Sequence, residues 1–381
     1  MGINFEHIPS PCFVLDENLL INNLKLLKYV RQKAGVKIIL ALKGFAFWHV
    51  FPLIKEYLDG ATASSLNEAM LINNKMNCKA HTYAPIYSQS EFPETASLSA
   101  YITFNSLGLW NRYKDFIFKT HPSLYCGLRI NPEYSEVEPD IYNPGSSLSR
   151  LGIKQNLFSD KLPEGITGLH FHLLCENNSY VLERTLQKTE EKFGHYFKQI
   201  EWLNMGGGHL ITHPDYDVAH LIKILINFKK RYPNIKTLIL EPGGAIGYRT
   251  GYLVSTVEDI IEHESIKIAM LDVSFAAHMP DCLEMPYKPD IVGAVENPTP
   301  YKYRMGGNTC LAGDYMGMGD YFFEKELKTG DKIIFKDMIH YTMVKTTFFN
   351  GVKHPSIAMW TKENEFKLLR SFGFGDYKNK L

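Results

Sequence analysis

The chain has 381 residues, with 41 lysines and arginines balanced by 41 aspartates and glutamates. A chain of this length exceeds the usual size of one hydrophobic core and indicates two domains. The balanced charge argues against nucleic acid or a membrane surface as the main partner. No apolar run reaches the ~18 residues that a membrane-spanning helix needs, so no such helix is expected.

The amino terminus and the cysteines indicate the cellular compartment in which the protein is expected. The opening MGINFEHIPSPCF has no basic segment followed by a long apolar one, so we expect no signal peptide. The six cysteines form no CxxC pair and are irregularly spaced, which makes a zinc or disulfide framework a weak interpretation. We therefore expect a cytoplasmic protein with reduced thiols.

Short apolar strands and amphipathic helices alternate through the first two thirds of the chain. Residues 1–16 are predicted to be extended, because Pro9 and Pro11 disfavour a helix. The hydrophobic spacing predicts helices at 18–34, 48–58, 66–76, 109–119, 180–199 and 218–231. Apolar runs predict strands at 38–42, 60–64, 81–84, 101–104, 124–130, 166–171, 201–205 and 237–240.

This alternation predicts a parallel sheet. Eight such strands close most simply into a (β/α)8 TIM-like barrel, predicted over residues 17–252, and a doubly wound open sheet is the structural alternative. After residue 252, helical periodicity is scarce and strands are predicted at 253–257, 266–273, 332–335 and 341–347. These strands predict a mostly β C-terminal domain of residues 253–381 that also takes in residues 1–16.

Lys43 ends the first predicted strand of the barrel, in the stretch VKIILALKGFAF. Burial disfavours the charged form of a lysine and lowers its pKa, and a neutral lysine is a nucleophile for carbonyl carbons. A lysine whose ammonium simply reaches solvent is the ordinary alternative. Barrels keep their chemistry at the C-terminal ends of strands, where Lys43 lies together with His172, Gly206–Gly208 and Glu241. This coincidence favours a functional Lys43.

Two further strand ends carry groups that can bind a charged ligand: backbone N–H groups for an anion and a carboxylate for a cation. Gly206, Gly207 and Gly208 follow an apolar strand, and successive glycines let backbone N–H groups approach a phosphate closely. A tight turn without a ligand is the alternative. Glu241 opens EPGG after the last apolar strand, where a carboxylate can hold a ring nitrogen protonated or can form an internal ion pair.

His170 and His172 lie on one side of a strand end, because side chains alternate along a strand. Two such histidines can begin a metal site, but no acidic third ligand lies at an informative spacing, so no metal is predicted. An imidazole lying flat on a cofactor ring, or a hydrogen-bonded core histidine, is favoured.

In the β-rich part, Cys310 stands in the Gly-rich turn GGNTCLAGD with Asp314 four residues on, which is typical of a site loop. Tyr341 opens a predicted strand and can donate its hydroxyl to a phosphate or pack in the core.

Nine motifs, in this order along nearly the whole chain, resemble the fold type III pyridoxal-phosphate decarboxylases. This alanine racemase-like family includes the diaminopimelate and ornithine decarboxylases. The motifs are ALKGF, ASSLNE, LRINP, SRLGI, HFH, MGGGH, EPGG, GNTC-x3-D and HYT. Within the family, EPGGAIGYRTGYL, AAHMPDCLEMPYKP and GNTCLAGD resemble the branch that decarboxylates carboxypolyamines such as carboxynorspermidine and carboxyspermidine.

The resemblance implies a pyridoxal 5'-phosphate enzyme of polyamine (spermidine) biosynthesis that acts on a small-molecule carboxypolyamine. It also implies a homodimer with shared active sites, with neither nucleic acid nor membrane as a partner. A diaminopimelate or ornithine-type decarboxylase is the alternative activity. A non-catalytic homologue that binds partners and a metal-dependent barrel hydrolase are alternatives from other classes, and the presence of Lys43, Glu241 and Cys310 disfavours the former.

The resemblance implies a role for each residue that matches a family motif. Lys43 matches the lysine that holds the cofactor covalently, and His172 matches the histidine stacked on its ring. Gly206, Gly207 and Gly208 match the phosphate loop. Glu241 matches the carboxylate on the ring nitrogen.

The β-rich domain carries the remaining matches. Cys310 matches a thiol that enters the site from the partner subunit, and Asp314 matches an acid that faces the distal amine of the substrate. Tyr341 matches a phosphate-contacting tyrosine. Asp272 and Glu284 are predicted to bind the cationic amines of a long substrate.

Some positions depart from the family pattern. Gly244 stands where the family often has the arginine of EPGR, so phosphate or carboxylate binding must be rearranged. Leu311 replaces an acidic residue that often follows the cysteine, and Thr62 replaces an aspartate of ornithine-type members. These departures point away from the diaminopimelate and ornithine enzymes. Arg129 and Arg150 match the motifs LRI and SRLG without a definite role.

Overall fold

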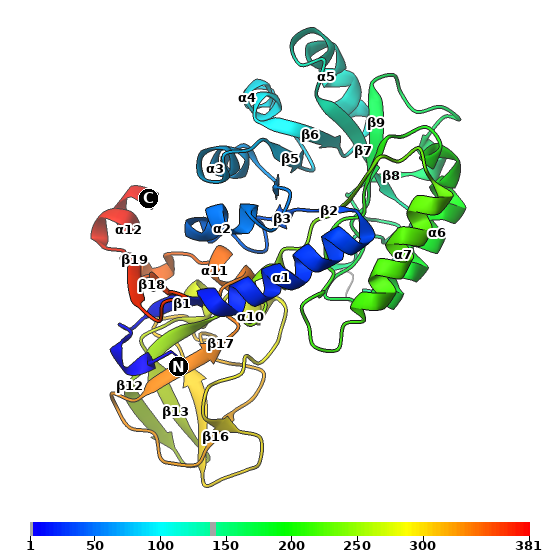
Figure 1. Cartoon of the computed structure of the whole chain (residues 1–381). Coiled ribbons are helices and arrows are strands. Elements are labelled where there is room, and N and C mark those ends of the chain that lie inside the picture. Colours follow the sequence, from blue (N-terminus) through cyan, green and yellow to red (C-terminus); the bar gives the residue numbers. More distant parts are fainter. Residues whose placement is uncertain (1–2, 138–141) are drawn as a thin grey trace. The chain divides into compact units, whose positions relative to one another are not determined.

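The computed structural model describes residues 3–137 and 142–381 (Figure 1). The chain folds into two compact units. One comprises residues 23–246, and the other joins the chain up to Asn22 with Gly247–Leu381. Across the described residues, no helix combines the length and the apolar character needed to span a membrane.

The larger unit contains a parallel sheet that returns to its starting segment. Its strands are β2 (Lys37–Ile38), β3 (Leu40–Ala41), β4 (Ala61–Ala63), β5 (Ala80–Tyr83), β6 (Ser99–Phe104), β7 (Tyr125–Asn131), β9 (Ile166–His170), β10 (Trp202–Asn204) and β11 (Thr237–Leu240). Their order is β2-β11-β10-β9-β7-β6-β5-β4-β3, with β8 (Ile153–Lys154) beside β7.

The strands β2 and β3 are halves of one segment that closes the barrel. Ile39, between them, donates its N–H to Leu240 of β11 at 3.0 Å, and Leu40 donates to Gly60 on the other side at 3.0 Å. The segment therefore hydrogen-bonds with both the last and the second strand. This closure confirms the (β/α)8 barrel and rules out the open sheet.

Helices surround these strands (Figure 1). They are α2 (Phe51–Lys55), α3 (Leu66–Met76), α4 (Phe92–Ser97), α5 (Leu107–Thr120), α6 (Ser179–Phe197), α7 (Val218–Arg231) and α8 (Gly244–Gly247), and α1 (Glu17–Ala34) precedes β2. The apolar stripe of α7 explains its packing, because Leu221, Leu225 and Phe228 recur at helical spacing and are fully buried. Asp217 caps its N-terminus by accepting the His220 N–H at 2.8 Å.

The second unit is built on a mostly antiparallel sheet. Its strands are β1 (Cys12–Asp16), β12 (Gly251–His263), β13 (Ile266–Leu271), β14 (Ala294–Val295), β15 (Tyr301–Gly306), β16 (Tyr321–Phe323), β17 (Lys332–Lys336), β18 (Ser356–Trp360) and β19 (Phe366–Arg370). The order is β14-β16-β15-β13-β12-β1-β18-β19, and β17 pairs with β12. Short helices connect them: α9 (Phe275–His278), α10 (Asp281–Glu284), α11 (Tyr341–Val344) and α12 (Phe374–Lys380). The mostly β C-terminal domain is therefore confirmed.

The strand predicted at 341–347 is wrong. Tyr341–Val344 form the short helix α11. The N–H groups of Met343 and Val344 both bond to the carbonyl of His340, so local hydrogen bonds replace a strand ladder. Tyr, Thr and Val favour strands only where a neighbouring strand and a half-buried surface receive them, and tertiary context overrides that preference here.

The helix predicted at 48–58 is shorter than expected. A 3-10 turn, Trp48–Val50, leads into α2, which ends at Lys55. Pro52 lies in the first turn of α2, where a proline is tolerated because its missing N–H has no partner inside the helix. The segment is divided at Val50, whose φ of −101° and ψ of 6° lie outside the helical region, whereas Phe51 before the proline is helical.

The barrel interior has no room for a side chain beside Trp202. A Cβ added to Gly168 would lie 1.9 Å from Trp202 Cε2, and one added to Gly127 would lie 2.5 Å from its Cη2 atom. Trp202 is itself 2% exposed. The indole therefore occupies the space that two glycines on the neighbouring strands β9 and β7 leave open.

We predict that Gly168→Ala destabilises the protein by about 1–3 kcal/mol, because the new methyl group overpacks the core against Trp202. Urea unfolding should show the loss as a lower midpoint. Gly108→Ala is the control, because this exposed helical position meets only Ser106 Oγ at 3.8 Å. Alanine there should raise stability by about 0.5–1 kcal/mol. Equal midpoints for the two variants would contradict this account of the core.

Candidate active site

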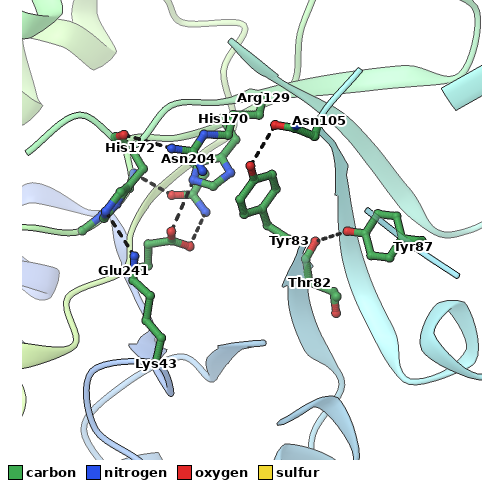
Figure 2. Close-up of polar contacts among 12 residues, drawn as sticks. Lys43, Thr82, Tyr83, Tyr87, Asn105, Arg129, His170, His172, Asn204 and Glu241 are labelled. Atoms are coloured by element: carbon green, nitrogen blue, oxygen red, sulfur yellow. Dashed lines mark hydrogen bonds and ion pairs between the residues drawn. The ribbon is translucent and has the colours of Figure 1, made fainter. Parts of the chain in front are cut away.

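Four strand ends that are distant in the sequence meet at one rim of the barrel. Lys43 follows β3, His172 follows β9, Gly206–Gly208 follow β10, and Glu241 follows β11. The sheet order places β9, β10, β11 and the β2–β3 segment next to one another. Parallel strands end at the same edge, so the side chains of Lys43, His172 and Glu241 converge, as Figure 2 shows.

The Lys43 amine faces an imidazole. Its Nζ lies 3.2 Å from Nε2 of His172. Desolvation by the surrounding protein lowers the pKa of Lys43, while the Glu241 carboxylate opposes this effect and the Arg129 guanidinium adds to it. The side chain nevertheless keeps solvent-accessible surface, which an incoming ligand requires.

The hydrogen bonds of His172 indicate a neutral lysine. The N–H of Gly207 donates to His172 Nδ1 at 2.8 Å, so Nδ1 carries no proton. Burial lowers the pKa of His172 well below its usual range, and the neutral ring then carries its proton on Nε2. This N–H points at Lys43 Nζ, which can accept it only as an uncharged amine. The tautomer and the lowered lysine pKa therefore agree.

Arg129 holds the backbone of this histidine. Its Nη2 donates to the carbonyl of His172 at 3.1 Å, and its guanidinium lies 4.6 Å from the centre of the Tyr83 ring. The Tyr83 hydroxyl in turn donates to Asn105 Oδ1 at 2.9 Å (Figure 2). Arg129 is 4% exposed, so a buried guanidinium fixes the backbone that carries the His172 imidazole. The structure thus gives Arg129 a contact in the site, whereas Arg150 has an exposed side chain.

The glycine loop is packed against backbone on both sides. Gly206 and Gly208 have φ values of +76° and +80°, which disfavour other residues. A Cβ on Gly208 would lie 1.9 Å from the Leu174 carbonyl oxygen, and one on Gly207 would lie 2.3 Å from that of Glu241. The loop therefore needs all three glycines for close approach of the backbone.

Two of the three glycine N–H groups bond inside the protein. Gly206 donates to Asn204 Oδ1 at 2.8 Å, and Gly207 donates to His172. Among the described residues, the Gly208 N–H has no protein acceptor. This loop thus offers a bound anion the Gly208 amide rather than three amides.

Glu241 is a buried carboxylate with a partner on each oxygen. Asn204 Nδ2 donates to Oε2 at 2.9 Å, and His170 Nε2 lies 3.3 Å from Oε1. Burial alone would raise the pKa of Glu241, but His170, His172 and Asn204 outweigh it and hold the pKa well below the usual range. Glu241 is therefore ionised. Asn204, which sequence reasoning did not single out, links the glycine loop to this carboxylate.

The turn after Lys43 packs directly on the turn after Glu241. A Cβ on Gly44 would lie 3.0 Å from Gly243 Cα and from the Gly244 nitrogen. Glycines at 44 and 243 therefore allow two backbones to touch, and this contact fixes Lys43 near Glu241. It is a physical reason for KGF and EPGG that the sequence alone did not reveal.

Reciprocal hydrogen bonds that resemble a capping box hold the start of helix α3. Ser65 accepts the Glu68 N–H at 3.2 Å, and Glu68 Oε2 accepts the Ser64 N–H at 2.6 Å. This exchange explains the SLNE part of the motif ASSLNE. Burial raises the pKa of Glu68, and the hydrogen bond from the Ser64 N–H opposes this shift.

The loop that carries Cys310 is held by hydrogen bonds within the β-rich unit. Asp314 is 5% exposed and accepts the N–H groups of Ala276 and Thr309, both at 3.0 Å, and the Thr309 hydroxyl at 2.5 Å. Cys310 is exposed, and its N–H donates to Asn350 Oδ1 at 3.0 Å. Asp314 thus shapes the loop, and Asn350 is a contact that sequence reasoning missed.

The other predicted residues of this unit have internal partners. Asp272 accepts the Ser10 hydroxyl at 2.6 Å and the Thr256 N–H at 2.9 Å, and burial raises its pKa despite these bonds. Glu284 forms an ion pair with Lys345 at 2.5 Å. Tyr341, the first residue of α11, is half-buried. Within the described part of the chain, no group of three His, Cys, Asp or Glu residues could hold a metal ion.

Comparison with known proteins identifies the family. The family model described as "Pyridoxal-dependent decarboxylase, C-terminal sheet domain" matches residues 12–339. The chain belongs to the pyridoxal-dependent decarboxylases. It is 51% identical over 375 residues to carboxyaminopropylagmatine decarboxylase of Synechocystis sp., covering 98% of this chain and 96% of that protein.

Three other comparisons cover at least 98% of each chain. Carboxynorspermidine/carboxyspermidine decarboxylase of Campylobacter jejuni is 43% identical over 385 residues, covering 98% of each protein. A crystal structure of carboxynorspermidine decarboxylase from that organism, complexed with norspermidine, has a TM-score of 0.90 and 41% identity, covering 98% of this chain and 100% of that one. Diaminopimelate decarboxylase of Helicobacter pylori, at a TM-score of 0.80 and 15% identity, shows the same fold.

The barrel rim of this decarboxylase fits pyridoxal phosphate. It offers a neutral amine for an aldehyde, an ionised carboxylate for a ring nitrogen, an imidazole beside the amine, and a close-packed glycine loop that a Cβ would obstruct. This set of groups matches what the cofactor needs from a protein. Lys43, His172, Gly208 and Glu241 are the residues that would hold it.

We predict that the apoenzyme captures the cofactor through Lys43 at an unusually low pH. The rate should rise with pH and level off below 10.5, the ordinary value for lysine, because the neutral amine is populated earlier. Glu241→Gln should move the profile to still lower pH, since the carboxylate raises the pKa of Lys43. Stopped-flow absorbance measures the rate at each pH.

Two variants control this experiment. Lys43→Ala should leave no cofactor covalently attached after borohydride reduction, as mass spectrometry detects. Lys37→Ala, at the other end of the same segment, should retain it. A wild-type rate that still rises at pH 10.5 would show that Lys43 is an ordinary lysine.

Proposed function

We propose that this enzyme decarboxylates a carboxypolyamine, carboxynorspermidine and/or carboxyspermidine, in polyamine biosynthesis. The observation that carries the proposal is full-length similarity to enzymes named for such substrates, at 43% and 33% identity. Carboxyaminopropylagmatine is the second candidate, favoured by the 51% identity to the Synechocystis enzyme. These substrates share a carboxylated aminopropyl end and differ at the distal end.

The barrel residues suit decarboxylation. Bound pyridoxal phosphate supplies a sink for the electron pair that remains when the carboxylate leaves as CO2. The ionised Glu241 favours a protonated ring nitrogen, which makes the sink strong. Lys43, as a neutral amine, would hold the cofactor through its aldehyde group. His172, held by Gly207 and Arg129, stays neutral and keeps its position.

Cys310 is proposed as the proton donor. Its Sγ–H would give a proton to the carbon that has lost CO2, within a homodimer in which each site takes this loop from the partner subunit. The exposure of Cys310 on a firmly bonded loop supports this role. Asp314, occupied by three donors, is assigned to holding the loop.

The remaining residues are proposed for substrate and phosphate. Asp272 and Glu284 supply carboxylates for cationic amines, and a substrate amine would replace Lys345 beside Glu284. Tyr341 is proposed to donate its hydroxyl to the phosphate, in a site where Gly244 removes the usual arginine. The six free cysteines support a cytoplasmic location.

Competition among substrates tests the proposal. We expect purified holoenzyme to release CO2 from a carboxypolyamine in preference to diaminopimelate or ornithine when all are present. Carboxynorspermidine and carboxyspermidine differ by one methylene, so their kcat/KM values should differ by no more than about 10–200-fold. Chromatography of the products identifies which compound is consumed. A preference for diaminopimelate or ornithine would overturn the proposal.

Replacing the thiol tests the proton donor. Cys310→Ala should lower kcat by about 10²-fold or more and divert turnovers into a side reaction that consumes the cofactor. Steady-state assays and the amount of cofactor remaining measure both effects. Cys78→Ala, which removes a thiol from the barrel unit, should leave kcat unchanged. Normal product at the normal rate from Cys310→Ala would exclude the role.

A further inference from the structure

A small polar cavity in the barrel unit is lined in part by the Glu241 carboxylate. It is lined by residues of several strands, among them Thr62, His81, Tyr101, Thr103, His170 and Glu241. Its free space fits about one water molecule. Cavities that stay dry are lined by apolar groups, whereas hydroxyls, imidazoles and a carboxylate line this one.

Two histidines in the cavity wall have buried nitrogens without a protein partner. Among the described residues, His81 Nδ1 and both ring nitrogens of His170 are buried and form no hydrogen bond that meets the usual geometry. The residues are 8% and 1% exposed. A buried polar atom without a hydrogen bond destabilises the folded protein by about 1–3 kcal/mol. A hydrogen-bond partner in the cavity would remove this cost.

The second nitrogen of His170 faces the functional carboxylate. Nε2 lies 3.3 Å from Glu241 Oε1, at the long end for a hydrogen bond, and the contact falls short of full hydrogen-bond geometry. Burial lowers the pKa of His170, so the ring is neutral and has a single proton to place. With that proton on Nε2, the ring donates to Glu241 and Nδ1 needs a donor. With it on Nδ1, two lone pairs would face each other across 3.3 Å.

Stacking on a neighbouring aromatic ring fixes the orientation of the His81 imidazole in the cavity wall. Its ring is stacked on Tyr101, with centroids 4.1 Å apart and planes at 13°. The Tyr101 ring packs edge-on against Trp202 at 5.2 Å. Burial lowers the pKa of His81 to about 3, so this ring is neutral as well and brings no second charge near Glu241.

We propose that a single water molecule occupies this cavity, donates to His170 Nδ1 and hydrogen-bonds with His81 Nδ1. The water fixes the His170 tautomer that donates to Glu241. His81 is thereby a positioning residue, acting through the water and His170 on the carboxylate that pairs with the cofactor ring. The inference rests on the proposed role of Glu241 and adds a residue of strand β5 to the site.

The holoenzyme offers two matched variants at position 81. His81→Phe keeps an aromatic ring on Tyr101 and removes the nitrogen, whereas His81→Asn keeps a polar group near the Nδ1 position and removes the stacked ring. A high-resolution crystal structure shows whether the water is present. NMR of holoenzyme that carries ¹⁵N-labelled pyridoxal phosphate measures the protonation state of the cofactor's ring nitrogen. Neither readout depends on which substrate the enzyme uses.

We expect the water in the wild type and in His81→Asn, and not in His81→Phe. In His81→Phe the ¹⁵N signal should shift, and kcat should fall roughly three- to tenfold, the effect of one net hydrogen bond, with KM unchanged. His81→Asn should restore the wild-type ¹⁵N shift. A dry cavity in the wild type, or an unchanged ¹⁵N shift in His81→Phe, would overturn the inference. If His81→Phe does not fold, the wild-type cavity and the ¹⁵N shift of His81→Asn decide it.

Discussion

The hydrogen bonds to the Glu241 carboxylate are the interaction on which the site depends. Asn204 donates to one oxygen and His170 Nε2 lies 3.3 Å from the other, and these contacts oppose the desolvation of a buried carboxylate. Asn204 also accepts from Gly206, so the same amide side chain fixes the glycine loop. A change in this one amide would therefore disturb both the carboxylate and the glycine loop.

The order of strands makes this arrangement possible. Lys43 and Glu241 are almost two hundred positions apart in the printed sequence, yet β2 pairs with β11 when the barrel closes. The contact of Gly44 with Gly243 then brings the two turns together. Closure of the barrel is thus a condition for the chemistry as well as for the fold.

Sequence reasoning predicted the parts that depend on local pattern. The bounds of α3, α7 and β11 follow from hydrophobic periodicity and capping residues, and the strand-end position of Lys43 and Glu241 follows from the barrel. The helix at Tyr341–Val344 was missed because tertiary contacts override local preference. Arg129 behind His172 and Asn350 behind Cys310 were missed as contacts, because only the folded chain brings these residues together.

The ionised state of Glu241 is the central physical claim, and infrared spectroscopy of carboxyl groups measures it directly. The band assigned to Glu241 by comparison with Glu241→Gln should remain that of a carboxylate at every pH at which the protein is folded, including values below 4.5, the ordinary value for glutamate. A band that titrates at or above 4.5 would contradict the account, because the ring nitrogen of the cofactor would then lack a fixed negative partner.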